Sequence, residues 1–118
     1  MEIIVVVLYG NIIGVVPGEG VTEINATVAT YYRGEPNIVV QELANDGITD
    51  ITMIEDFLQY YGMTLYRDNF IVVINKDTDE VISKVDNSGK SVFIDKKFKT
   101  LTFDSQNDVN AYLKSLDL

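Results

Sequence analysis

The side chains of this sequence that could carry chemistry are carboxylates, hydroxyls and lysines. The chain has no histidine and no cysteine, which removes the commonest general base, the commonest transition-metal ligands and the thiolate nucleophile. A pair of carboxyl groups is enough for glycoside hydrolysis. No pair stands out by its spacing, however, and there is no tryptophan to stack on a sugar. We therefore expect no catalytic residues, no metal site and no cofactor, and a carboxylate-based enzyme is the third hypothesis.

Two short motifs fail on their spacing. Gly89-Lys90-Ser91 is similar to the end of a phosphate-binding loop, but the position where such a loop needs its first glycine is Lys84. Asp77, Asp79 and Glu80 crowd one predicted turn, and the residues after them lack the ligand and the glycine of an EF-hand loop. Both segments are interpreted as turns that face solvent, and weak cation binding by the acidic turn is left open.

Negative charge is concentrated in the first half of the chain. Residues 1–66 hold nine acidic residues against Arg33 alone, a net charge of −8, whereas residues 67–118 hold nine acidic and eight basic residues, a net charge of −1. Direct binding to DNA or RNA is disfavoured, because phosphate contacts need clustered lysine and arginine. The one basic cluster, Lys96, Lys97 and Lys99, is interpreted as protection of a strand edge. The acidic half is either a solvated surface or a face that meets a basic partner.

Tyrosine follows the same distribution as the charge. Six of the seven tyrosines lie within residues 1–66, and exposed tyrosine suits protein interfaces. Adjacent strand residues point to opposite faces, which directs Tyr31 outward and Tyr32 toward the core. The alternative is that these rings only close a sheet edge. The predicted partner-binding residues are Glu19, Glu23, Tyr31, Glu35, Glu55, Asp56 and Tyr60.

The elements that must position these residues follow from hydrophobic periodicity. In the first half we expect strands over residues 2–9, 12–16, 21–32 and 37–43, with a hairpin turn at Gly10-Asn11. The apolar residues at 54, 57, 58 and 61 predict a helix over about residues 53–61. Thr52 and Glu55 have the spacing of a capping box, and Gly62 suits the position after the last turn.

The second half repeats the pattern of strands followed by a helix. Strands are expected over residues 64–66, 70–75, 81–85, 91–94 and 98–103, and a helix that begins after Ser105 is expected over residues 106–116. Asp56-Phe57 precedes Asp108-Val109 by 52 positions, so a duplication is left open. We predict one α+β domain over residues 1–118, with a mostly antiparallel sheet and two amphipathic helices packed on it.

The apolar stretch over residues 3–16 is interpreted as a buried strand pair. Glu2 stands where a signal peptide needs positive charge, Gly10-Asn11 interrupts the stretch, and its length is too short for a helix to cross a bilayer. We therefore expect no membrane contact and a cytoplasmic protein.

In size and composition the chain resembles the small acidic inhibitors of phages and mobile elements, and the immunity proteins against nuclease toxins; no family motif accompanies this resemblance. It implies a non-enzymatic protein that occupies a basic site on a nucleic-acid-handling protein, in the host cytoplasm if it is phage-encoded. The alternative hypothesis is a structural or assembly protein, such as a virion component, that self-associates through sheet edges. Homo-oligomerisation is left open.

Overall fold

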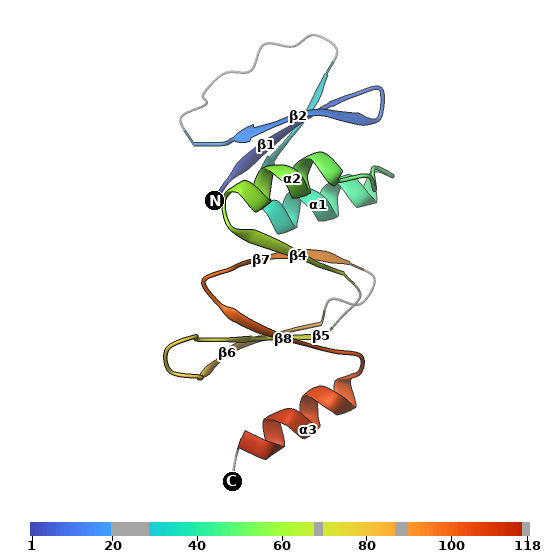
Figure 1. Cartoon of the computed structure of the whole chain (residues 1–118). Coiled ribbons are helices and arrows are strands. Elements are labelled where there is room, and N and C mark those ends of the chain that lie inside the picture. The colour runs from blue at the N-terminus through green and yellow to red at the C-terminus, as the bar shows by residue number, and fades with distance from the viewer. Residues whose placement is uncertain (20–28, 68–69, 87–89, 117–118) are drawn as a thin grey trace. The chain divides into compact units, whose positions relative to one another are not determined.

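A computed structural model describes residues 1–19, 29–67, 70–86 and 90–116 of the chain. This part forms three helices and eight strands in antiparallel sheets, which confirms the predicted α+β class. The strands belong to three sheets and not to one. The chain divides into two compact units, Met1–Tyr61 (unit 1) and Gly62–Leu118 (unit 2), and each is described by itself (Figure 1). The single domain over residues 1–118 stays a prediction.

The centre of unit 1 is strand β1 (Ile3–Leu8), which lies between β2 (Asn11–Pro17) and β3 (Thr30–Gly34) in an antiparallel sheet. Its apolar run does not alternate with polar residues, as is typical of a strand that is buried on both faces. The first three residues of β1 are indeed inaccessible to solvent. Of the strand predicted over residues 21–32, only the end lies in β3, since residues 20–28 are outside the described part.

The turn between β1 and β2 consists of Tyr9 and Gly10, one position earlier than predicted. Both residues have positive φ angles, 51° and 77°, as in the type I′ turn that matches the twist of hairpin strands. Glycine adopts this conformation freely, whereas a tyrosine is uncommon there. The Tyr9 side chain is 90% exposed, so no packing within the described residues compensates for the backbone strain.

Replacing Tyr9 by asparagine is expected to stabilise unit 1 by about 1 kcal/mol, because asparagine tolerates the left-handed conformation and tyrosine does not. Chemical denaturation measures this gain. Tyr9→Ala is the control, since alanine removes the ring but has no preference for the left-handed region. Equal stability of the asparagine and alanine variants would contradict the assigned turn.

Helix α1 (Pro36–Asn45) replaces the strand predicted over residues 37–43, and that prediction is wrong. Pro36 occupies the first turn, where its missing N–H costs nothing and its fixed φ favours the helix. The buried residues Val39, Val40 and Leu43 lie on one helical face, which packs on β3 and β1. Tertiary packing of this face overrides the strand propensity of the valines.

Helix α2 (Thr52–Tyr60) confirms the helix predicted over residues 53–61. Ile54 and Leu58 are completely buried, and Gly62 after the helix has the expected left-handed φ of 80°. The helix packs on β2, so α1 and α2 cover the same face of the unit 1 sheet (Figure 1).

Unit 2 matches the predicted elements closely. Strand β5 (Phe70–Ile74) lies between β6 (Val81–Asp86) and β8 (Lys99–Phe103), while β4 (Met63–Arg67) pairs with β7 (Ser91–Asp95). Helix α3 (Gln106–Leu116) follows β8 and packs on β5 and β8.

The beginning and the packing of α3 follow from four side chains of unit 2. The hydroxyl of Ser105 accepts a hydrogen bond from the backbone N–H of Asp108 at 3.2 Å, which is the expected N-cap. Val109 is buried in a cluster with Val72 and Ile74. The predicted helix is therefore both capped and anchored at its first turns.

The two units share a local topology. In each, a central strand has its hairpin partner on one side and a later strand on the other, and the later strand leads into a helix, as β1-β2-β3-α1 and as β5-β6-β8-α3. This correspondence pairs α3 with α1. The 52-residue spacing in the sequence pairs α3 with α2 instead, so the spacing does not reflect equivalent positions in the two topologies.

Candidate functional site

The uneven charge of the sequence belongs to one structural unit. The boundary between the units falls after Tyr61, and residues 62–66 carry no charge. Unit 1 therefore holds the whole net charge of −8, and unit 2 holds −1.

The one basic side chain of unit 1, Arg33, and the N-terminal ammonium, which the side-chain count of −8 leaves out, lie at the end of its sheet where β1 begins. The Arg33 guanidinium pairs with Glu2, with 2.6 Å between Nε and Oε1, and it donates to the carbonyl of Gly18 at 3.1 Å. The N-terminal ammonium pairs with Glu35 at 3.0 Å. Glu35, a predicted site residue, is thus an ion-pair partner of the chain terminus, and the exposed Glu19 lies at the same end of the sheet.

Five further carboxylates belong to the helices and the loop between them. We call this set the acidic helix layer: Glu42, Asp46, Asp50, Glu55 and Asp56. Glu55 is half-buried and the other four are exposed. All five come later in the chain than Arg33 and the N-terminus, which are the two positive groups of the unit.

Two members of the acidic helix layer lie at the C-terminal end of α1. The Asp46 carboxylate accepts a hydrogen bond from the Tyr32 hydroxyl. This bond raises the pKa of Tyr32, with smaller contributions from burial and from the charges of Asp46 and Glu42. The last turn of α1 has no basic residue, and negative charge at a helix C-terminus opposes the macrodipole. Apart from the bond to Tyr32, these charges therefore do not favour the fold.

Asp50 begins α2 in place of the predicted capping box. Thr52 lies inside the helix, and the N-cap residue Ile51 makes no side-chain cap. Instead, Asp50 Oδ1 accepts hydrogen bonds from the Thr52 hydroxyl at 2.7 Å and from the Thr52 N–H at 3.2 Å. These two bonds lower the pKa of Asp50 below 3.8, and the bond from the hydroxyl has the larger effect. The residue is therefore ionised at neutral pH.

Because the folded-state pKa of Asp50 is depressed, its stabilising contribution exists above the unfolded-state value near 3.8 and is lost as the pH falls through the folded-state value. We therefore expect Asp50→Ala to lower the melting temperature at neutral pH and to melt like the wild type in strong acid. Thermal unfolding across the pH range measures the difference. Asp50→Asn is the control: its amide oxygen still accepts hydrogen bonds, so its deficit at neutral pH is expected to be smaller than that of the alanine variant, and it also shrinks in acid, where the wild-type carboxyl is protonated. A deficit of the alanine variant that does not change with pH would contradict the stabilising role of ionised Asp50.

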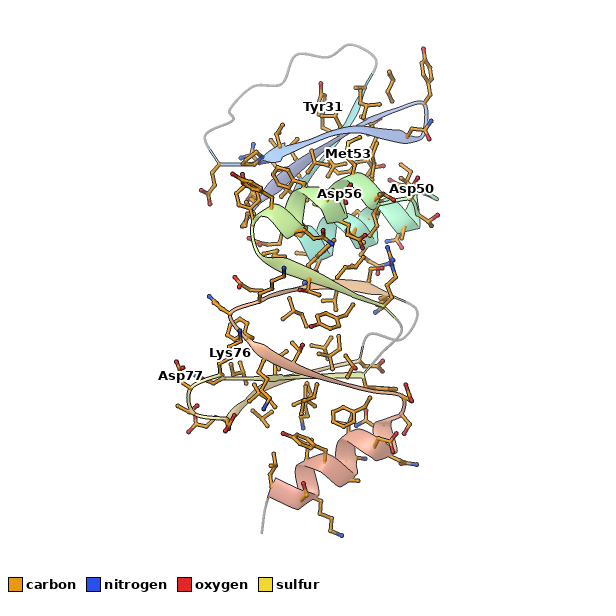
Figure 2. The ribbon with its side chains drawn as sticks, viewed as in Figure 1. Tyr31, Asp50, Met53, Asp56, Lys76 and Asp77 are labelled. Carbon is orange, nitrogen blue, oxygen red and sulfur yellow. The ribbon has the colours of Figure 1, made fainter. Side chains whose placement is uncertain are left out.

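A cavity of about 480 Å³ opens beside Asp50. We call it the turn cavity, because residues of the β1–β2 turn, the α1–α2 loop and the start of α2 line it. Figure 2 shows Asp50 in the loop before α2, with Met53 and Asp56 following on the helix. The lining residues are Gly10, Asn11, Ile12, Gly47, Ile48, Thr49, Asp50, Thr52, Met53 and Asp56. The turn cavity thus combines carboxylates with apolar walls.

The remaining predicted site residues occupy different surfaces. Tyr32 pairs with Val5 and reaches the end of α1, so the neighbouring Tyr31, which pairs with Val6, projects from the sheet face away from the helices (Figure 2). Tyr31 is half-buried there. Tyr60 is 85% exposed near the end of α2. Glu23 lies outside the described residues. Helix α2 therefore brings together Glu55, Asp56 and Tyr60, but not the whole predicted set.

Sequence reasoning missed Asp50 and the turn cavity. An aspartate before the first turn of a helix is a recognised start signal, and it could have identified Asp50 as the residue that accepts hydrogen bonds at the start of α2. No signal in the sequence could have identified the turn cavity, because it forms only where a hairpin turn meets a helix–helix loop.

Other kinds of site find no support in the described part of the chain. None of its acidic residues form a group of three or more that could hold a metal ion, and this includes the turn with Asp77, Asp79 and Glu80. Among the same residues, no helix has the length and apolar character needed to span a bilayer. Comparison of the chain with protein-family models, with curated proteins and with solved structures finds no match.

Proposed function

We propose that unit 1 is a non-enzymatic binding module whose acidic helix layer meets a basic surface on a protein partner. The observation that carries the proposal is the side-chain charge of −8 within one compact unit, whose one basic side chain, Arg33, and N-terminal ammonium lie at the end of its sheet where β1 begins. A protein that handles nucleic acid presents clustered lysine and arginine to phosphates. Carboxylates compete with phosphates for such a surface. We therefore propose that the protein acts as an inhibitor or an immunity protein.

The cost of the acidic residues to the fold supports the proposal. Glu42 and Asp46 lie at the end of α1 where the helix dipole disfavours negative charge. Lysine or glutamine in place of Glu42 would suit an isolated fold better, whereas Asp46 also accepts the hydrogen bond from Tyr32. A basic partner compensates this cost, because its positive groups face both the carboxylates and the negative end of the helix.

The proposal is tested with an arginine-rich peptide as a stand-in for the basic partner. Binding measured by fluorescence anisotropy is expected to weaken steeply as salt is added, since charges on exposed surfaces are screened. A peptide with glutamine in place of every arginine is the control and is not expected to bind. Affinity that is independent of salt, or equal for the two peptides, would refute an electrostatic binding face.

A second candidate function is self-assembly through sheet edges. Edge strand β2 exposes Ile13 and Val16, and edge strand β6 exposes Ile82. An apolar edge strand is a template for pairing with another chain. Light scattering over a concentration series separates the two functions: growth of oligomers with concentration favours assembly, and a monomer at every concentration favours the binding module.

A further inference from the structure

We propose that the turn cavity of unit 1 receives an arginine side chain of the partner. This inference rests on the proposed function and names the contact at the centre of the proposed interface. The turn cavity has a volume of about 480 Å³, within the range of about 300–1,000 Å³ that is typical of ligand pockets, so one long side chain can enter.

The walls of the turn cavity match the two parts of an arginine side chain. Ile12, Ile48 and Met53 supply apolar surface for the methylene stem. Asp50 and Asp56 supply carboxylates for the guanidinium group, whose planar fork of donors suits carboxylates better than the point charge of lysine does.

The hydrogen bonds around Asp50 leave acceptor capacity for a cation. Both bonds from Thr52 fall on Oδ1, so Oδ2 is available to a ligand. Asp56 is exposed and forms no ion pair within the described residues. A guanidinium placed between the two carboxylates would form charge-assisted hydrogen bonds, which are about twice as strong as neutral ones.

Competing ligands fit the turn cavity less well. A helix N-terminus attracts anions, but the N–H of Thr52 already donates to Asp50, and two carboxylates repel a further negative charge. A metal ion would need a larger group of acidic ligands than the described residues provide. An organic cation with an apolar stem is the remaining match to the lining.

The first test is an NMR titration of the whole chain with N-acetylarginine methylamide. We expect amide shifts to change at Gly10, Asn11, Met53 and the loop over residues 47–50. The matched control is the citrulline analogue, which keeps the shape of the side chain and lacks its charge. It is expected to leave the chemical shifts of these amides unchanged. Equal shifts with both compounds, or none up to the solubility limit of the arginine compound, would overturn the inference.

The second test compares two single neutralisations in the same unit. Asp56→Asn removes a carboxylate that lines the turn cavity, whereas Glu42→Gln removes an exposed carboxylate that does not. We expect Asp56→Asn to lower the affinity for the arginine compound about tenfold, and Glu42→Gln to lower it less than about twofold.

The outcome of this comparison separates the inference from the proposed function. If both variants weaken binding equally while the arginine-rich peptide still binds in a salt-dependent way, the acidic face stands and the turn cavity is not its centre. If the arginine-rich peptide does not bind the wild type at all, the proposed function itself fails.

Discussion

Reversal of three exposed carboxylates in unit 1, Glu19→Lys, Glu42→Lys and Asp56→Lys, is expected to lower the affinity for an arginine-rich peptide by about 100-fold. Each reversal changes the charge by two units, so unit 1 passes from −8 to −2. None of the three residues caps a helix or forms an ion pair within the described residues. The fold should therefore survive, and circular dichroism checks that it does.

A matched triple variant in unit 2 separates a local acidic face from the total charge of the chain. Asp77→Lys, Glu80→Lys and Asp104→Lys change exposed residues and bring the whole chain to the same net charge as the first variant. They leave unit 1 at −8. We expect this variant to bind within about threefold of the wild type, since it leaves every carboxylate of the acidic helix layer unchanged. Equal losses for the two triple variants would mean that no particular face of the protein is recognised.

Truncation of a single core residue is expected to have the largest effect on stability. Leu58 of α2 is completely buried, and Leu58→Ala should destabilise unit 1 by about 2–5 kcal/mol through lost burial and the cavity left behind. Urea denaturation measures this loss. Met53→Ala is the control on the same helix: Met53 is 43% exposed, and its truncation should cost less than about 1 kcal/mol.

Hydrogen exchange tells whether this loss is confined to one unit. Because the chain divides into two compact units, we expect Leu58→Ala to reduce the protection of amides in β1 more than that of amides in β5. Equal loss in both strands would show that the two units unfold as one, as the prediction of a single domain implies.

The elements of unit 2 and helix α2 could be predicted from the sequence because local signals agree there. Short apolar runs are separated by turn residues, and α3 begins at a serine whose hydroxyl caps Asp108. In α1 the local signals conflict, since Ile38, Val39 and Val40 favour a strand while Pro36 favours the first turn of a helix. Packing against the sheet decides between them, and only the folded chain contains that information.

The candidate site was only partly predictable for the same reason. The concentration of charge in the first half and the outward direction of Tyr31 follow from counting and from strand alternation. The structure then places Tyr31 on the sheet face opposite the helices and pairs Glu35 with the N-terminus. The turn cavity depends on a hairpin turn and a loop that are far apart in the sequence. Hydrophobic periodicity carries no information about contacts between such distant segments.

The most direct test of an acidic recognition face in unit 1 is a chemical-shift map of the wild-type chain titrated with the arginine-rich peptide. We expect the perturbed amides to lie in the α1–α2 loop, the first turns of α2 and the β1–β2 turn. The chemical shifts of the amides of β5 and α3 in unit 2 should not change. Shifts spread evenly over both units, or centred on unit 2, would contradict the account.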